Sequence, residues 1–209
     1  MVTLRPFEKA DLDNLYEISL ATGYAGGDAA ALYQDPRMIG HIYSAPYALL
    51  SSVTSLVAED AAGVGGYVVG VVDTRAFEDR LEREWWPQLR AVYADPSGTS
   101  SSGWNPDQRR SYLIHHPFRT PDAIVETYPS HLHMNLLPRM QGQGVGRLLL
   151  ELWFGAARSR GAKGVHVGVS AHNPRGIRFW ESCGFFQLEN APTGATIWLG
   201  RHLDAALSN

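Results

Sequence analysis

The clearest pattern of apolar and polar positions lies in the second half of the chain, on both sides of a glycine-rich turn. Before the turn, apolar residues gather in the short segment 131–137, which Pro138 ends. After the turn, apolar residues recur at the spacing of one helix face, at Val145, Leu148, Leu149, Leu152, Trp153 and Ala156. The pattern predicts a strand, a glycine turn and an amphipathic helix in that order.

The chain then predicts a second strand and a second helix. Residues 164–170 carry β-branched residues at alternate positions, as a buried strand does. Asn173 and Pro174 suit the N-cap and the first position of a helix, and Gly184 suits its left-handed C-cap. A further strand opens at residues 185–186.

The first half of the chain predicts two helices and three strands. In chain order they are an edge strand at 2–7, a helix that begins near Asp11, a helix that Asp35 and Pro36 start and Pro46 ends, and a hairpin of strands at 55–59 and 66–73. A glycine-rich loop at 22–29 lies between the two helices. The whole chain thus mixes strands and helices, which is typical of an α/β domain.

The glycine turn, residues 141–146, favours an anionic ligand. Its three glycines let the backbone bend tightly and let a ligand approach bare N–H groups. Those N–H groups open a helix, whose positive end attracts a phosphate or pyrophosphate.

Other types of glycine turn are alternatives for the same residues. A nucleotide-hydrolase phosphate loop needs a lysine after its last glycine, and a dinucleotide fingerprint needs the glycines in another order. Neither pattern is present in Gln141-Gly142-Gln143-Gly144-Val145-Gly146. A tight strand-to-helix connection without a ligand is the remaining alternative.

Two motifs together resemble the GCN5-related N-acetyltransferase (GNAT) superfamily. The superfamily's pyrophosphate motif, Q/R-x-x-G-x-G/A, matches residues 141–146. Its second signature, an asparagine and a helix that ends in aromatic-x-x-x-G-F, matches Asn173 through Trp180 to Phe185. The resemblance implies an α/β (α+β) fold, with a mixed, mostly antiparallel central sheet flanked by helices.

A narrower resemblance links most of the chain to the acetyltransferase-like C-terminal region of the O-GlcNAcases. It rests on residues 128–138, on Val72-Asp73-Thr74-Arg75-Ala76-Phe77 and on Ile197-Trp198-Leu199-Gly200-Arg201. In O-GlcNAcases the glycine motif is degraded, whereas here it is intact. The chain is therefore similar to free-standing bacterial relatives of that region, and the intact motif favours binding of acetyl-CoA.

Residues 75–128 form an insertion relative to the short connection that the superfamily has at this point. We expect one domain over residues 1–209 that carries this insertion. Its apolar residues recur near helical spacing at Phe77, Leu81, Trp85, Trp86 and Leu89, and a second helix is expected from Asp107 towards His115. The insertion could form a substrate wall, a dimer surface, or a packing element without further function.

The resemblance implies that acetyl-CoA lies where two central strands splay apart. Backbone groups near Leu136 and Leu137 would pair with its pantetheine arm, and the amides of residues 142–146 would hold its pyrophosphate. The full set of expected cofactor-binding residues is Leu136, Leu137, Arg139, Gln141, Gly142, Gln143, Gly144, Val145, Gly146, Arg147, Asn173, Arg178 and Trp180. The arginines could equally be solvated, and Asn173 could be only a helix cap.

The expected catalytic residues are Asp73, His133 and Trp180. Acetyl transfer needs removal of a proton from the amine, for which Asp73, His131, His133 and His172 are candidates. Trp180 stands where many members carry a tyrosine that protonates the leaving thiolate. Because an indole cannot give up a proton at neutral pH, we expect Trp180 to shape the pocket instead.

A metal site is not expected. The spacing of His131 and His133 points both imidazoles to one face of a strand. Zinc needs further ligands, and no third one is obvious nearby in the sequence.

These features predict an acetyl-CoA-dependent N-acetyltransferase. The acetyl group would move by direct attack of a primary amine, whether of a protein lysine, an amino sugar or a small amine. The alternative is a catalytically silent module that binds CoA or a protein, and Trp180 is the feature that favours it. A homodimer formed through the tryptophan-rich insertion is compatible with either function.

Composition and charge limit the partners and the location that we expect for the protein. The net charge of −3, without a long basic run, argues against nucleic acid as a partner. No segment approaches the roughly 20 apolar residues of a membrane helix, and the first residues lack the apolar core of a signal peptide. A single cysteine, Cys183, excludes an internal disulfide and suits the cytoplasm.

Overall fold

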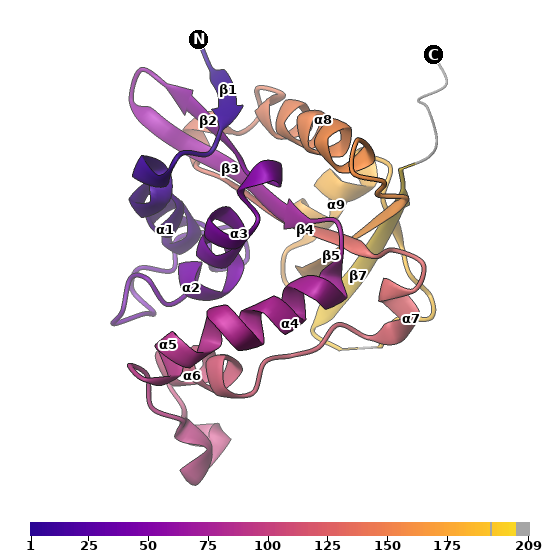
Figure 1. Cartoon of the computed structure of the whole chain (residues 1–209). Helices are drawn as coiled ribbons and strands as arrows, with labels where there is room; N and C mark the ends of the chain where they lie inside the picture. Colours follow the sequence, from indigo (N-terminus) through magenta and orange to yellow (C-terminus); the bar gives the residue numbers. More distant parts are fainter. Residues whose placement is uncertain (193, 204–209) are drawn as a thin grey trace.

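A central sheet with helices on both faces organises the molecule (Figure 1). The structure is a computed structural model that describes residues 1–192 and 194–203. Within these residues, seven strands form one sheet in the order β1-β2-β3-β4-β5-β7-β6. The expected domain end at residue 209 lies outside the described residues.

Every pair of neighbouring strands in this sheet is antiparallel except β4 and β5, which run parallel. The strands are β1 (Thr3–Pro6), β2 (Leu56–Asp60), β3 (Gly63–Val71), β4 (Ser130–Leu136), β5 (Gly164–Ser170), β6 (Phe186–Gln187) and β7 (Thr196–His202). The expected mixed, mostly antiparallel sheet is therefore confirmed.

Two groups of helices cover the two faces of the sheet (Figure 1). One face is packed by α8 (Val145–Arg158) and α9 (Pro174–Ser182). The other is packed by α1 (Leu12–Ala21), α2 (Gly40–Tyr43), α3 (Ala45–Leu50), α4 (Thr74–Glu84), α5 (Trp86–Arg90) and α6 (Pro106–His115). The remaining helix, α7 (Asp122–Val125), leads into β4.

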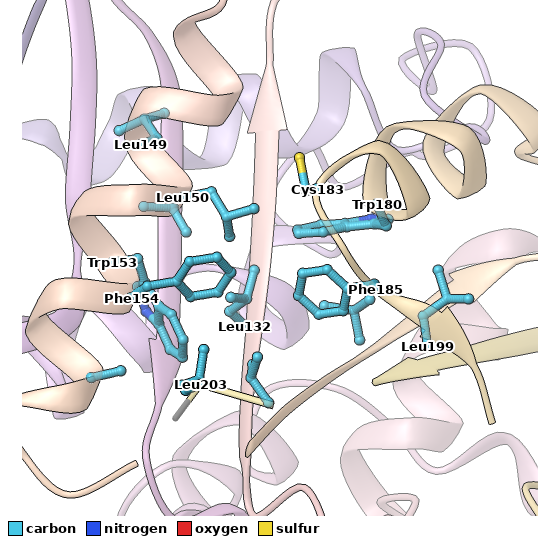
Figure 2. Close-up of a cluster of buried hydrophobic side chains, with 14 of the residues drawn as sticks. Leu132, Leu149, Leu150, Trp153, Phe154, Trp180, Cys183, Phe185, Leu199 and Leu203 are labelled. Carbon is cyan, nitrogen blue, oxygen red and sulfur yellow. The ribbon is translucent and has the colours of Figure 1, made fainter. Parts of the chain in front are cut away.

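Residues of β3 alternate between the two cores, as the two-residue period of a strand requires. Val68 packs into the core under α8, and Val69 packs into the core under the other helices. In the α8 core, Leu149, Trp153 and Phe154 are fully buried (Figure 2). Burying each such side chain stabilises the fold by about 1.5–3 kcal/mol, so α8 is held firmly against the sheet.

Two prolines begin helices where the sequence analysis expected one helix to end and another to continue. The expected helix from Asp35 to Pro46 is wrong, because Pro46 lies in the first turn of α3 instead of ending a helix. The expected helix through Trp85 and Leu89 breaks between α4 and α5, with Pro87 in the first turn of α5. Proline lacks an N–H, so it fits the first turn of a helix, where that donor has no partner.

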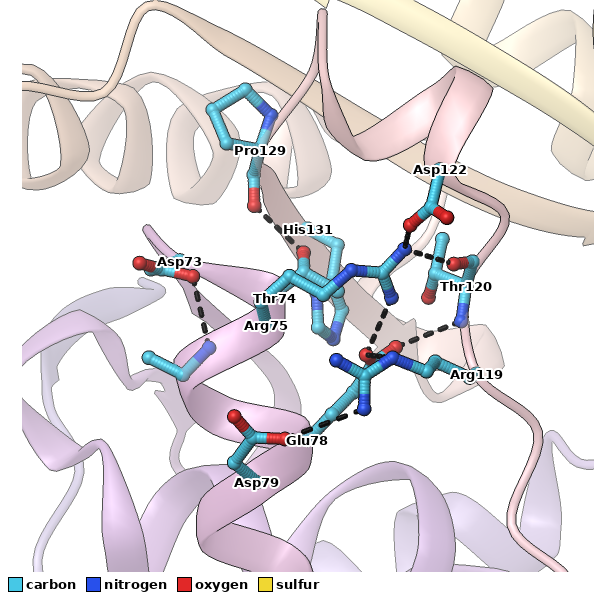
Figure 3. A network of polar contacts seen from close by, with 11 residues as sticks. Asp73, Thr74, Arg75, Glu78, Asp79, Arg119, Thr120, Asp122, Pro129 and His131 are labelled. Atoms are coloured by element: carbon cyan, nitrogen blue, oxygen red, sulfur yellow. Dashed lines mark hydrogen bonds and ion pairs between the residues drawn. The ribbon is translucent and has the colours of Figure 1, made fainter.

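Hydrogen bonds join the two ends of the inserted segment to each other and to the residue before β4. Arg75, in the first turn of α4, donates to Glu78 (2.6 Å), to the carbonyl of Thr120 (2.6 Å) and to Asp122 (Figure 3). Thr74 beside it donates from its backbone to the carbonyl of Pro129 (2.9 Å). The insertion therefore holds the start of β4 from the side.

The parallel pair β4 and β5 separates soon after it begins. The two strands pair at Ser130 with Val165 and at His131 with His166, and their pairing ends there. Beyond that point β4 keeps its pairing with β3, and β5 keeps its pairing with β7. Two strands in the middle of the sheet thus turn backbone edges towards the gap between them.

None of the helices among the described residues is both long enough and apolar enough to cross a lipid bilayer.

Candidate functional site

The open edge of β4 is made by the backbone of Met134 and Leu136. The N–H of Leu137 donates to the carbonyl of Gly65 on the β3 side (2.8 Å). Backbone groups alternate in direction along an antiparallel strand, so Met134 and Leu136 direct theirs towards β5. The carbonyl of Leu137 also accepts from Met140 (2.9 Å). Leu137, which the sequence suggested for this edge, therefore has both of its backbone groups engaged.

A glycine loop follows this edge directly and opens α8. Gly142 and Gly144 adopt left-handed φ angles of 73° and 77°, which L side chains rarely adopt. Gly144 is the N-cap of α8, and no side chain caps the helix there. The N–H groups of Val145, Gly146 and Arg147 are left without helical partners, because the first N–H groups of a helix have none. They form the positive end of a 14-residue helix.

The loop is pressed against β4 by two close contacts. The side-chain amide of Gln141 donates to the carbonyl of Leu136 (2.7 Å), at the open edge. A Cβ at Gly146 would lie 3.2 Å from the Leu136 side chain and 3.2 Å from the ring of Phe179. Glycine at this position therefore lets the start of α8 sit directly beside both β4 and α9.

Other expected cofactor residues have partners in the protein or lie at the surface. Arg139 forms an ion pair with Asp60 (3.2 Å) and donates to the carbonyls of Gly63 and Val64 (3.0 Å each). Arg147 donates to the carbonyl of Ser182 (3.0 Å), and Gln143 donates to the carbonyl of Arg139 (2.7 Å). Arg178 is exposed on α9, and the Val145 side chain is buried in the core.

The loop after α1 crosses from β4 to the start of α9. At its first residue, Thr22 accepts from the side-chain amide of Asn135 on β4 (2.6 Å). At its turn, Gly26 lies beside Asn173, whose amide nitrogen would be 3.6 Å from a Cβ placed there. Asn173 itself caps α9 by accepting from the N–H of Gly176 (2.8 Å). One loop thus lies beside both β4 and the start of α9.

One face of β4 carries a chain of polar side chains with fixed protons. The hydroxyl of Thr74 is 2.7 Å from the carbonyl of Pro129, which can only accept, so Thr74 donates to it. Nδ1 of His131 lies 2.8 Å from the same hydroxyl and must therefore carry a proton. Nε2 of His131 then accepts from Tyr47 (2.8 Å), and Tyr47 accepts in turn from Nε2 of His133 (3.1 Å).

This series of hydrogen bonds leaves Nδ1 as the proton acceptor of His133. Burial keeps both imidazoles neutral: it lowers the pKa of His133 to about 4 and that of His131 well below its ordinary value. The nearby ring of His166 adds to both shifts. His133 is therefore held as a neutral base by a tyrosine from α3.

The other two expected catalytic residues lie elsewhere. Asp73 caps α4 by accepting from the N–H of Ala76 (3.0 Å; Figure 3). It follows Val71, which pairs with His131, so it lies past the closed end of the gap. Trp180 is only 7% exposed and packs in the α8 core, with its ring 5.1 Å from that of Phe185 (Figure 2). The fold therefore does not bring these two residues together with His133.

Reasoning from the sequence missed two contributors to the site. Met134 could have been found by counting alternate residues back from the turn at Pro138. Tyr47 lies 84 residues before His131, and no local pattern pairs the two. Its role depends on how α3 packs against the sheet.

A sequence profile of the acetyltransferase (GNAT) family matches residues 12–185. That range includes the open edge of β4, the glycine loop and α9. The chain belongs to the GNAT family. The expected family is thereby confirmed, and the protein is a GNAT acetyltransferase by descent.

Three further comparisons show which proteins the chain is similar to. The protein O-GlcNAcase of Rattus norvegicus is 24% identical over 206 residues, which are 96% of this chain and 22% of the relative. The chain thus spans about a fifth of that relative's length. The crystal structure of SsHAT is 33% identical, with a TM-score of 0.89 over 98% of this chain and 99% of the other. The PaiA N-acetyltransferase from Thermoplasma acidophilum, solved with coenzyme A, shares the fold at 13% identity, with a TM-score of 0.57 over 97% and 99% of the two chains.

The half-buried His133 and the buried His166 predict that the protein loses stability on acidification. Folding lowers the pKa of His133 and His166 to about 4 from the ordinary 6.5. Above pH 6.5 both histidines are neutral in the folded and in the unfolded chain. Between pH 6.5 and about 4 they take up protons in the unfolded chain but stay neutral in the folded chain. The free energy of unfolding should fall by about 1.4 kcal/mol per pH unit for each such histidine.

Urea unfolding between pH 4.5 and 7.5 measures this slope. His133→Asn should reduce the slope by the share of one histidine, and substitution of the exposed His172 by glutamine should leave it unchanged. An equal slope in the wild type and in His133→Asn would contradict the burial of a neutral His133.

Proposed function

We propose that this protein transfers acetyl from acetyl-CoA to a primary amine. One arrangement carries the proposal: the open backbone edge of β4 runs directly into a glycine loop and an uncapped helix start. Extended amide groups need a strand edge, and a pyrophosphate needs clustered N–H donors. Acetyl-CoA carries both groups in one molecule. The coenzyme A bound by the PaiA enzyme supports the same assignment.

In this proposal the pantetheine arm pairs with Met134 and Leu136 as an added strand would. The N–H groups of residues 142–147 receive the pyrophosphate, and Asn173 faces the arm from the other side of the gap. Arg147 and Arg178, near the loop and on α9, would add positive charge for the phosphates. Arg139 could join them only by leaving Asp60, so we assign it to the β2–β3 turn.

The reaction is direct transfer at the thioester carbonyl. The neutral amine attacks the carbonyl carbon, a C–N bond forms, and the C–S bond breaks. Nδ1 of His133 accepts the proton that the amine nitrogen loses and then returns it to water, because burial disfavours the charged ring; Tyr47 holds the ring by its Nε2. The thiolate takes its proton from water, because Trp180 is packed in the core and its indole is not acidic at neutral pH.

Three further features bear on the domain organisation, the location and the oligomeric state of the protein. Helices α4 to α6 share a core with α1 and β3, so we propose a single domain that includes the insertion. The one cysteine, Cys183, is buried and free, which suits a cytoplasmic protein. A homodimer is compatible with this function, and the silent CoA-binding module differs from it only in lacking turnover.

A pair of glycine variants tests acetyl-CoA binding. Gly144 and Gly161 both have left-handed φ angles, of 77° and 82°, and both face open space. Aspartate therefore strains the backbone equally at the two positions, but only Gly144→Asp places a carboxylate at the uncapped start of α8. We expect calorimetry to show acetyl-CoA binding at least about 10-fold weaker in Gly144→Asp and unchanged in Gly161→Asp. Equal binding by both variants would contradict the assigned pyrophosphate site.

Substitution of His133 tests the proton transfer. With an accepted amine, His133→Asn should lower kcat about 100-fold, the lower end expected for loss of a general base, and leave acetyl-CoA binding intact. The release of CoA thiol measures kcat, and calorimetry measures the binding. His116→Gln, an exposed histidine of the insertion, is the control. A wild-type kcat in His133→Asn would remove His133 from the mechanism, and absence of thiol release with every amine would favour the silent module.

A further inference from the structure

The insertion places an arginine without a carboxylate partner beside the histidine face of β4. Arg110, on α6, is partly buried. Its Nε donates to the hydroxyl of Tyr33 (3.0 Å), and its Nη1 donates to the hydroxyl of Tyr43 (3.0 Å). Among the described residues, no carboxylate lies at ion-pair distance from it. A guanidinium removed from water without a counter-charge is costly, so this arrangement needs a functional explanation.

The arginine and its two tyrosines form a cluster of donors. An arginine has five N–H donors, and Arg110 uses two of them on the tyrosines. Each tyrosine accepts from Arg110 and so keeps its own O–H proton to donate. Neither hydroxyl has another partner among the residues that the structure describes. Within residues 1–192 and 194–203, no acceptor contacts the donors that remain on Nη1 and Nη2 of Arg110 and on the two hydroxyls.

The nearest acid on the same helix is committed to another contact. Asp107, one turn before Arg110, accepts from the N–H groups of Gln34 and Asp35 (3.0 Å each). This contact fastens the loop that carries Tyr33 to α6. Asp107 therefore fixes the cluster in place without neutralising Arg110.

Tyr43 connects this cluster to the proposed reaction centre. Its ring lies edge-on to that of His133, with 5.5 Å between centroids, and its hydroxyl contacts Arg110. The guanidinium carbon also lies 5.3 Å from the centre of the same ring. His133 and Arg110 therefore contact the same tyrosine, one at its ring and the other at its hydroxyl.

We propose that Arg110, Tyr33 and Tyr43 bind the carboxylate of the acceptor, which makes the substrate a small amine that also carries a carboxylate. Two N–H groups at the end of a guanidinium match the two oxygens of a carboxylate, and the hydroxyls add further donors. The cation repels an acceptor that bears only an ammonium group, such as a lysine within a protein. The inference rests on the proposed acetyl transfer and gives the insertion the role of a substrate wall.

Pairs of amines that differ only in a carboxylate test this inference. The pairs are 4-aminobutyrate with propylamine, lysine with cadaverine, and phenylalanine with phenethylamine. Calorimetry measures their binding to protein saturated with coenzyme A, which cannot transfer acetyl. In at least one pair, the wild type should bind the carboxylated member about 10- to 100-fold more tightly.

Variants show whether Arg110 is responsible. Arg110→Gln should abolish the preference for the carboxylate, whereas the adjacent and exposed Arg109→Gln should keep it. Tyr33→Phe keeps the packed ring and removes one donor, so it should reduce the preference about threefold even if Arg110→Gln fails to fold. The inference is overturned if no pair shows a preference in the wild type, or if both Arg110→Gln and Tyr33→Phe retain it in full.

Turnover is measured separately, as release of CoA thiol. Carboxylate-dependent binding without any thiol release would contradict the acetyl transfer and support the subsite. If both members of every pair turn over equally, the carboxylate subsite is contradicted and the acetyl transfer is supported. Turnover of a lysine within a peptide would have the same meaning.

Discussion

The early end of pairing between β4 and β5 is the constraint on which the rest of the site depends. After His131 and His166 the two strands no longer share hydrogen bonds, yet both remain in the middle of the sheet. Backbone groups in such a place need partners. The protein supplies one at the end of the gap, where Gln141 donates to the carbonyl of Leu136. The edge at Met134 is where we propose that the pantetheine arm pairs as an added strand would.

The two faces of the sheet contribute different side chains around this gap. The face under α8 and α9 is apolar and closely packed, and it holds the glycine loop at the end of β4. The opposite face carries the histidines of β4, and the tyrosines of α2 and α3 pack against them. The insertion extends this second face and adds Arg110. In the proposed function, one face positions the acetyl donor and the other receives the acceptor.

Local sequence predicted those parts of the protein that are determined by neighbouring residues. The strand of residues 131–137, the glycine turn and the two helices that follow could be read directly from spacing, caps and glycines. The role of the prolines was ambiguous in the sequence. Pro46 was expected to end a helix, and Pro87 falls where the apolar spacing predicts one continuous helix, but both lie in the first turn of a helix. A proline fits the first turn of a helix as well as it ends one.

Long-range contacts could not be predicted in the same way. The bond between Tyr47 and His131 spans 84 residues, and the contact between Arg110 and Tyr33 spans 77. Asp73 looked suitable because it follows a strand, but the antiparallel pairing of β3 with β4 puts it past the closed end of the gap. Trp180 aligned with a catalytic position, but its side chain packs in the core.

Amide hydrogen exchange at single residues tests the central claim most directly. NMR of the 15N-labelled protein, with and without acetyl-CoA, reports on each N–H of β4. Acetyl-CoA should slow exchange at Met134 and Leu136 and at residues 145–147. His133 and Asn135, already paired with β3, should change little. Binding of acetyl-CoA without new protection at Met134 and Leu136 would show that the open edge of β4 is not where the ligand lies.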